Sequence, residues 1–459
     1  MRLAIGLSAA LLLSLSLISC GRRADPLSPV LVVGADGLEW NVLEPLLKAG
    51  RLPHLASLIE RGTAGRLATY DNSNWGTYSP VIWTTIATGK SPLKHGIRHF
   101  QHARGAAYTS ASRIGKALWN IASDWGLTCQ VSGWWVTWPA EEIRGQMVSS
   151  TAVTAQVGEI WKGSFLENVE NQTYPPELRQ EIDPLVRELL ADPHRTETRL
   201  LELLPERPAG LSFDAVTSRL LQQTAWSFAS DEFYVRVARE LASRETADLT
   251  LVYVGGTDTV GHRFWGYREP AKYKYPLPGA GLFGLEGLID RYYEGFDGWL
   301  GDLLKCFPPQ TTVIVLSDHG MHAMYLDEPL EAGITGGHFD GPEGVLIAAG
   351  PGIRHERHTA ANRPLLGSVQ DVTPTVLYLL GIPLGADMDG DLLRGLLDPR
   401  LLESRSLATV ETHDKGFRLP TSPRLDERLD RAFAKQFSDL GYFEGSPPQP
   451  SGRVGSQRK

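Results

Sequence analysis

The sequence predicts an α/β fold in which a mostly parallel central sheet carries helices on both faces. Short uncharged runs rich in β-branched residues, such as VIVL at 313–316, are typical of strands that are buried on both faces. Segments with helical spacing follow several of these runs, which is the alternation that builds a parallel sheet. The length of 459 residues favours one large domain with an insertion over three equal domains.

The composition is that of an ordinary globular protein, with 42% apolar and 21% charged residues. The formal net charge of −8 argues against a nucleic-acid-binding protein, which would normally carry a basic face. Beyond residue 20 the chain has two cysteines, Cys129 and Cys306, and neither belongs to a CxxC motif. They support no functional prediction.

The first twenty residues indicate a targeting segment. Arg2 provides a positive start, and the apolar run at 3–17 is too short for a membrane span. The sequence LISCG at 17–21 resembles a bacterial lipobox, which implies cleavage before Cys20 and lipid attachment to it. We therefore expect a signal peptide at 1–20 and a lipid-anchored protein of the bacterial cell envelope. The alternative is a plain secreted protein. For a lipoprotein, Gly21 after the cysteine favours the outer membrane or periplasm over the inner membrane.

The remaining chain divides into five expected parts. Residues 21–29 form a polar tether, and residues 30–150 and 245–400 form the catalytic domain. Residues 151–244 break the alternating pattern and predict a helical insertion over the strand ends. Residues 401–459 predict a C-terminal helix at 425–440 and a disordered tail.

Within the catalytic domain, periodicity predicts individual strands and helices. The expected strands are 30–35, 249–254, 312–316 and 344–349. The expected helices are 41–50, 54–61, 79–89, 287–305 and 371–381, with 176–190, 196–204 and 231–244 in the insertion.

The segment SPVIWTTIATG at 79–89 combines a helix start with a candidate nucleophile. Ser79 before Pro80 is typical of an N-cap, and Gly89 ends the helix. A helix N-terminus can equally hold a phosphate against a serine hydroxyl, because its N–H groups are free. The residues themselves leave both interpretations open. The rival hydroxyls are Thr77, Thr84 and Thr85.

Acids and imidazoles lie next to the predicted strands. They are Asp36, Asp258, His262, Asp318, His319 and His338. Each could belong to an ordinary polar turn, since turns favour Asp and Gly. Asp258 and His262 are four residues apart, which places both on one face of a helical turn, as in many chelating pairs. Open parallel sheets bind ligands beyond the carboxyl ends of their strands, so we expect the six side chains to meet at one edge.

Three carboxylates, three imidazoles and the Ser79 hydroxyl are enough to bind two zinc-like ions. A pair of ions about 4 Å apart suits in-line displacement at phosphorus. Metal coordination would also lower the pKa of a serine hydroxyl, which is otherwise a weak nucleophile. The sequence therefore predicts a two-metal hydrolase.

The chain resembles the alkaline phosphatase superfamily, and within it the type I phosphodiesterase/nucleotide pyrophosphatase branch. The resemblance covers about residues 30–150 and 245–395. It depends on motifs that occur in this order: VLVVGADGL, SPVIWTTIATGKSPLKHGI, GGTDTVGH, LSDHGM, GGHFDG and DVTPTVLYLLGIP.

The resemblance implies an assignment for each candidate residue. One zinc would bind Asp36, Ser79, Asp318 and His319, and the other would bind Asp258, His262 and His338. The nucleophile of several branches lies nine residues before the Thr of a Thr-Gly pair. That position is Ser79, counted from Thr88, rather than Thr77 or Thr84.

Two positions depart from the branch. The diesterase nucleophile is usually threonine, and a phosphate-binding asparagine usually follows His-Gly-Ile, where this chain has Arg98-His99-Phe100. The phosphate could instead be bound by backbone N–H groups or by Lys90. A sulfatase is set aside, because Val81 and Trp83 stand where it needs Pro and Arg.

We therefore expect hydrolysis of phosphodiesters or nucleotide pyrophosphates through a phosphoserine and two Zn²⁺ ions. The substrate would be a small-molecule, lipid or nucleotide phosphate ester. The alternatives are a phosphomonoesterase, phosphonate hydrolase or phosphomutase, and, from another class, a non-catalytic surface lipoprotein. The cluster of Trp134, Trp135 and Trp138 could stack a base or sugar, but core or rim packing is the favoured interpretation.

Overall fold

The structure of the chain is a computed structural model that describes residues 26, 28–71, 73–102, 107–152, 169–190, 200, 202, 214–277, 284–329, 333–418 and 420. The predicted signal peptide with Cys20, most of the predicted helix 196–204 and the predicted helix 425–440 lie outside the described residues. Among the described helices, none is both long and apolar enough to cross a membrane.

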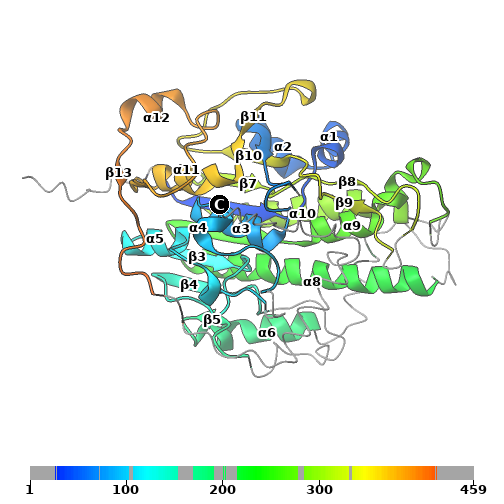
Figure 1. Cartoon of the computed structure of the whole chain (residues 1–459), viewed down its shortest axis with the longest axis horizontal. Coiled ribbons are helices and arrows are strands. Elements are labelled where there is room, and N and C mark those ends of the chain that lie inside the picture. The colour runs from blue at the N-terminus through cyan, green and yellow to red at the C-terminus, as the bar shows by residue number, and fades with distance from the viewer. Residues whose placement is uncertain are drawn as a thin grey trace, which may run out of the picture.

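A nine-stranded sheet forms the centre of the molecule (Figure 1). The strand order is β11-β2-β10-β7-β1-β6-β3-β4-β5. The strands are β1 (Val30–Ala35), β2 (Gly62–Ala68), β3 (Cys129–Ser132), β4 (Gly145–Val148), β5 (Thr173–Tyr174), β6 (Leu249–Val254), β7 (Thr312–Leu316), β10 (Gly344–Ala349) and β11 (Leu365–Ser368). Strands β10 and β5 run against their neighbours, and the other pairings are parallel. The predicted mostly parallel α/β fold is confirmed.

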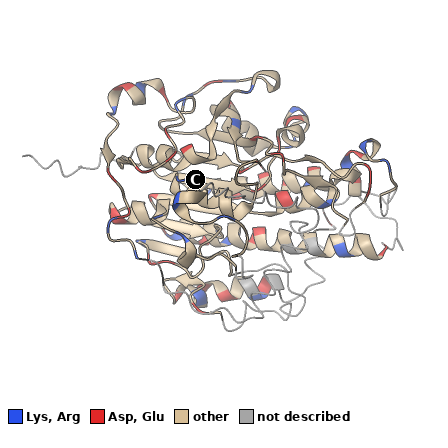
Figure 2. Cartoon of the chain, in the orientation of Figure 1, with Lys and Arg blue, Asp and Glu red and all other residues tan. Residues whose placement is uncertain are grey.

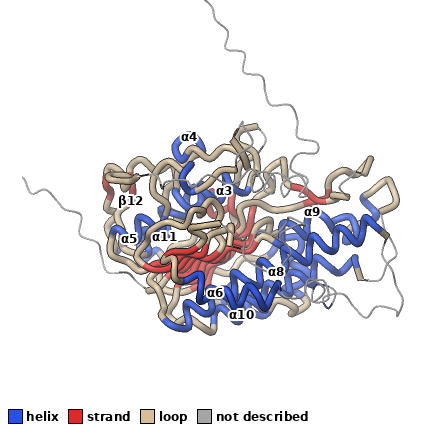
Figure 3. The backbone as a smooth tube through the Cα atoms, turned by 90° about the horizontal axis from the view of Figure 1, so that it is seen from below, coloured by secondary structure: helices blue, strands red, loops and turns tan. Residues whose placement is uncertain are grey.

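The two faces of the sheet contribute to different hydrophobic cores. In β1, Leu31, Val33 and Ala35 pack in one core, whereas Val30 and Val32 pack in the other. This alternation follows from the two-residue period of a strand. Helices cover both faces, as Figure 3 shows with the strands between two layers of helix.

The helices on the first face are α1 (Trp40–Lys48), α2 (Pro53–Glu60), α8 (Ala215–Arg244), α9 (Gly256–Arg268) and α10 (Leu288–Leu304). The helices on the second face are α3 (Ser79–Thr88), α5 (Leu118–Asp124) and α11 (Val372–Leu379). Three further helices are α4 (Pro92–His95), α6 (Leu178–Leu190) and α12 (Pro399–Ser404). Short 3₁₀ turns are η1 (Ser110–Ser112), η2 (Pro270–Lys272), η3 (Leu285–Gly287), η4 (Ala360–Asn362) and η5 (Val369–Asp371).

Two small sheets complete the described structure. They pair β8 (His322–Ala323) with β9 (Gly336–Gly337), and β12 (Leu384–Gly385) with β13 (Thr409–Val410). Basic and acidic residues are interspersed along the described elements (Figure 2).

The inner strands β1, β6, β7 and β10 match their predicted limits, but five described strands of the large sheet, namely β2, β3, β4, β5 and β11, were not predicted. Strand β3 has only four residues. Strand β2 reads GTAGRLA, with two glycines and one β-branched residue, so its local propensity for a strand is low. Strands β4, β5 and β11 have two to four residues each, too few to show a period of two. The predicted helix 231–244 is the second half of α8, which begins at Ala215. This helix packs along the face of the sheet against β6 and β3.

The register of the inner strands places several loops at one edge of the sheet. Ala35 at the end of β1 pairs with Val254 at the end of β6, and Gly34 pairs with Leu316 at the end of β7. Because these strands are parallel, the residues after them emerge side by side. Strand β10 runs in the opposite direction, so the residues before it arrive at this same edge.

Candidate metal centre and nucleophile

The first cluster consists of Asp36, Asp318 and His319, which follow β1 and β7. All three are at most 1% exposed. His319 Nε2 lies 3.3 Å from Asp36 Oδ1 and 3.4 Å from Asp318 Oδ2. None of these three buried atoms has a hydrogen-bond partner within the described part of the chain. Buried polar atoms are normally paired, so three that face one another indicate a group that fits a cation.

The second cluster consists of Asp258, His262 and His338. Asp258 Oδ1 lies 3.3 Å from His262 Nε2 and 3.4 Å from His338 Nε2, and the two Nε2 atoms are 3.0 Å apart. Asp258 and His262 occupy successive turns of α9, as their spacing predicted. His338 follows β9 and precedes β10. The structure therefore brings together all six carboxylates and imidazoles named from the sequence.

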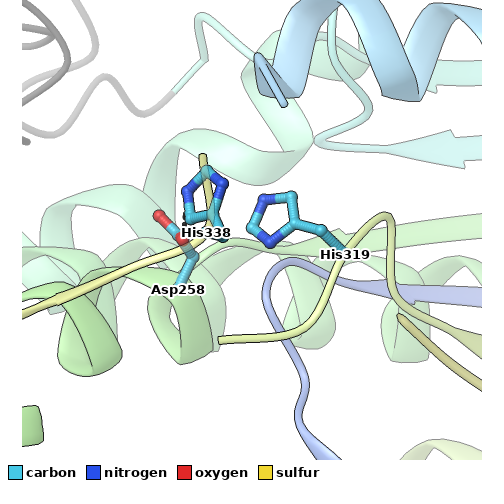
Figure 4. A group of neighbouring side chains, drawn as sticks. All are labelled: Asp258, His319 and His338. Carbon is cyan, nitrogen blue, oxygen red and sulfur yellow. Dashed lines mark ion pairs between the residues drawn. The ribbon is translucent and has the colours of Figure 1, made fainter. Parts of the chain in front are cut away.

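The two clusters touch through their histidines. The rings of His319 and His338 stack with centroids 3.6 Å apart, and ligand atoms of Asp258, His319 and His338 also form a group that could hold an ion (Figure 4). His319 therefore lies between the two clusters.

The donor set fits a small divalent cation. A tetrahedral ion at about 2.0–2.1 Å from its ligands has ligand–ligand distances of about 3.3–3.4 Å. Four of the five distances within the clusters are 3.3 or 3.4 Å. Imidazole nitrogen and carboxylate oxygen together are ligands that zinc accepts. The residues present therefore fit two metal ions, whereas the distances do not identify the metal.

Each imidazole is oriented through its other nitrogen. The Nδ1 atoms of His262 and His319 lie 3.0 Å and 2.9 Å from the carbonyl oxygens of Gly336 and Gly320. His338 Nδ1 lies 2.9 Å from Thr77 Oγ1. A carbonyl can only accept, so Nδ1–H is the donor in the first two bonds. This arrangement turns Nε2 towards the cluster, as metal-binding histidines require.

Asp36 is held by two buried donors that the sequence analysis did not find. Trp83 Nε1 donates to Asp36 Oδ2 at 2.9 Å, and the Tyr253 hydroxyl donates to this oxygen at 2.6 Å. Both donors engage Oδ2, so Oδ1 is directed at His319. The sequence contained one indication of the Trp83 contact, because Trp83 lies one helical turn after the candidate nucleophile Ser79.

The electrostatics of the first cluster favour a positive charge. Burial and the neighbouring Asp36 raise the pKa of Asp318 well above its usual value. Burial lowers the pKa of His319, but Asp318 and Asp36 outweigh it and raise this pKa to about 10. A proton on His319 thus compensates carboxylate charge at the place where a metal ion would do so. Binding of a cation would release this proton.

Ser79 is the first residue of α3 and is 3% exposed. The N-cap was one of the two interpretations that the sequence left open for Ser79, but Tyr78 occupies the N-cap position. Thr77 contacts His338, and Trp83 contacts Asp36. Ser79 therefore lies in the sequence between two residues that contact the clusters. Thr77, two positions earlier, contacts the second cluster, and Trp83, four positions later, contacts the first.

The rival hydroxyls have other partners. Thr84 donates to the carbonyl of Pro80 at 2.6 Å, and Thr85 donates to that of Val81 at 3.0 Å. Such bonds to the residue four positions earlier are common for threonine inside a helix. Thr77 donates to the His338 carbonyl at 3.2 Å.

Lys90, which the sequence suggested as a phosphate-binding residue, follows α3 at the end opposite Ser79. The two ends are about 15 Å apart along the helix. Its Nζ lies 2.7 Å from Asp387 and also pairs with Asp414, and the residue is 4% exposed. The structure therefore pairs Lys90 with two partly buried aspartates, and its role in phosphate binding stays a prediction.

The tryptophan cluster largely follows the packing interpretation. Trp134 is fully buried, with its ring edge-on to Trp83 at 5.1 Å, and Trp138 is 3% exposed. Trp138 Nε1 donates to the carbonyl of Glu170 at 2.9 Å. Trp135 is half-buried and packs beside Phe100, where the sequence departs from the diesterase pattern.

The fold and the two clusters define an α/β protein with buried groups that could bind metal at one edge of its sheet. The family model of Type I phosphodiesterase / nucleotide pyrophosphatase matches residues 30–358. The chain therefore belongs to this family, which is part of the alkaline phosphatase superfamily. A comparison with curated proteins gave no match.

Several solved structures are similar to parts of this chain. Phosphonoacetate hydrolase from Sinorhizobium meliloti 1021 has 19% identity and a TM-score of 0.39, and the match covers 66% of this chain and 58% of the hydrolase. Human ectonucleotide pyrophosphatase / phosphodiesterase 5 has 14% identity and a TM-score of 0.46, with 81% and 100% covered. A mutant of alkaline phosphatase PafA has 11% identity and a TM-score of 0.48, with 82% and 100% covered.

Proposed function

We propose that this protein hydrolyses phosphodiesters or nucleotide pyrophosphates, with Ser79 as nucleophile and two divalent ions, most simply Zn²⁺, as cofactors. The observation that carries the proposal is the set of buried atoms that face one another, Asp36 Oδ1, Asp318 Oδ2 and His319 Nε2. A protein without chemistry at this edge would have no reason to hold them so.

The residues divide between the two ions as the family pattern implies. Asp36, Asp318, His319 and the Ser79 hydroxyl would hold one ion, and Asp258, His262 and His338 would hold the other. When bound, the ions would lower the pKa of a coordinated hydroxyl and offset the negative charge that grows on the phosphoryl oxygens. The N–H groups at the start of α3 would add donors for those oxygens.

Ser79 is the group that reacts. Its Oγ gives up a proton and forms a bond to phosphorus, while the bond from phosphorus to the leaving oxygen breaks and that oxygen takes a proton. A water molecule then attacks the phosphoserine, and the Ser79 oxygen leaves with a proton. Each half is a displacement at phosphorus, and the enzyme returns to its starting state.

One apolar residue bears on whether the substrate is a phosphodiester or a phosphomonoester. Phe100 belongs to the segment Arg98-His99-Phe100, which stands where the diesterase branch usually has a phosphate-binding asparagine. It is 1% exposed and packs with Tyr78 and Trp135. An apolar ring cannot donate to a phosphate oxygen. A phosphomonoesterase, phosphonate hydrolase or phosphomutase therefore remains the second candidate. The lipid anchor at Cys20 and the envelope location remain predictions from the leader segment.

The test combines activity with metal content. Ser79→Ala should lower the rate on bis-p-nitrophenyl and p-nitrophenyl phosphate by at least about 1000-fold, because the nucleophile is lost. Metal content after dialysis, measured by mass spectrometry, should stay near two ions per chain. Thr84→Val removes a hydroxyl from the same helix and should leave both measurements unchanged. Dialysed wild-type protein without metal, or full activity in Ser79→Ala, would overturn the proposal.

A further inference from the structure

Asp231, in the middle of α8, is a buried carboxylate outside both clusters. It is 3% exposed. It accepts hydrogen bonds from the backbone N–H of Gly255 at 2.8 Å and of Gly256 at 2.9 Å, and from the Tyr292 hydroxyl at 2.9 Å. These donors come from the turn between β6 and α9 and from α10. One side chain therefore joins three separate elements.

The two N–H groups belong to the start of α9, where Gly255 is the N-cap and Gly256 the first helical residue. The first N–H groups of a helix have no partner inside it and are usually satisfied by the side chain of the N-cap. Glycine has no side chain, so α9 obtains its acceptor from a different helix. A carboxylate at this end also interacts favourably with the helix dipole.

The turn held by Asp231 leads directly into the metal-binding residues. Asp258 lies two residues after Gly256, and the Thr257 hydroxyl between them donates to the carbonyl of Asp36. A Cβ on Gly256 would lie 1.7 Å from Tyr292 Oη and 2.6 Å from Asp231 Oδ2. The contact is thus so close that only glycine fits, and a shift of this turn would move ligands of both clusters.

We propose that Asp231 is a positioning residue for the second metal cluster, which fixes the start of α9 and thereby sets Asp258 and His262 for metal binding. This inference depends on the proposed function, because it assumes that the clusters bind ions. It also gives α8 a part in the site, whereas the sequence predicted only a helical insertion over the strand ends for this region.

The test compares two buried aspartates of similar local chemistry. Asp297, in α10, is 2% exposed and accepts N–H groups from His54 at 3.1 Å and Leu55 at 2.7 Å, in the first turn of α2. No ligand of either cluster is among these partners. Asp231→Asn and Asp297→Asn each replace one accepting oxygen by an amide, so both should lower the melting temperature of the metal-free protein.

Only Asp231→Asn should weaken metal binding. We expect one of the two Zn²⁺ ions to bind about tenfold more weakly in chelator competition, because partners of metal ligands contribute 10–100-fold and Asp231 acts through the backbone. Asp297→Asn should keep both affinities within twofold. The measurement is made at pH 8, because burial raises the pKa of Asp231 to about 7 and the carboxylate must be ionised.

The outcomes separate this inference from the proposed function. If the wild-type protein binds no Zn²⁺, the proposed function fails and the inference fails with it. If the wild-type protein binds two ions and Asp231→Asn binds both equally well, only the inference is overturned. If Asp231→Asn does not fold, Tyr292→Phe decides. Loss of its hydroxyl should weaken one ion by severalfold, and unchanged affinities for both ions would overturn the inference.

Discussion

Thr77→Val tests whether the orientation of His338 depends on a single hydroxyl. Thr77 is 1% exposed, and its Oγ1 lies 2.9 Å from His338 Nδ1 and 3.2 Å from the His338 carbonyl oxygen. The hydroxyl donates to the carbonyl, so it accepts from Nδ1–H. Valine has nearly the same shape as threonine and removes both bonds. The ring then loses the partner that keeps its proton on Nδ1 and its lone pair on Nε2.

The expected loss of metal affinity in Thr77→Val follows from these contacts. A neutral hydrogen bond contributes about 0.5–1.5 kcal/mol, and a buried donor left without a partner costs about 1–3 kcal/mol. A net loss of about 1.4–2.8 kcal/mol in metal binding corresponds to 10–100-fold weaker affinity, the range found for partners of metal-binding histidines. The weakened ion should be the one that His338 contacts.

Chelator competition with Zn²⁺ measures this affinity, and Thr84→Val is the matched control. Thr84 is also 1% exposed, and its hydroxyl donates to a carbonyl of its own helix without touching a ligand. The control should bind both ions as the wild type does. Equal affinities in Thr77→Val and the wild type would refute the assigned role of Thr77. Loss of turnover with both ions fully bound would instead identify Thr77 as a reacting group.

Two further predictions concern residues near the site in sequence. Lys90→Met should lower the melting temperature, because it breaks the pairs with Asp387 and Asp414, while KM for bis-p-nitrophenyl phosphate stays within twofold. A tenfold rise in KM at unchanged melting temperature would support the substrate role predicted for Lys90. Burial lowers the pKa of His95 to about 3, so His95 binds its proton more readily in the unfolded chain than in the folded one. Its contribution to the unfolding free energy is complete above about pH 6.5 and falls by about 1.4 kcal/mol per pH unit between 6.5 and 3. In urea unfolding, the difference in unfolding free energy between wild type and His95→Gln should decrease with this slope as the pH falls. A pH-independent difference would contradict the prediction.

The sequence was sufficient to predict the inner strands and to predict that the six candidate ligand residues lie close together. Strands β1, β6 and β7 are continuous apolar runs because both of their faces are buried, so their limits are visible in the residues themselves. The spacing of Asp258 and His262 likewise fixed their shared face on α9. These are local properties, which a single sequence can express.

The contacts that hold the site are not local. Asp36 and Tyr253 are 217 residues apart, and Thr77 and His338 are 261 residues apart. No pattern within the sequence pairs them, since both partners of each contact are ordinary residues for their own elements. The ion pairs of Lys90 were not predicted for the same reason, because its acidic partners lie about 300 residues further along the chain.

The direction of β10 explains why His338, which precedes this strand of the large sheet instead of following it, still reaches the metal centre. Three parallel strands bring Asp36, Asp318 with His319, and the turn before Asp258 to their carboxyl ends. A fourth parallel strand would have carried the residues preceding it to the opposite edge of the sheet. Strand β10 is antiparallel to β7, with Leu346 paired to Leu316. The loop that precedes β10 therefore arrives at the carboxyl edge, and the stack of His338 on His319 joins the two clusters into one site.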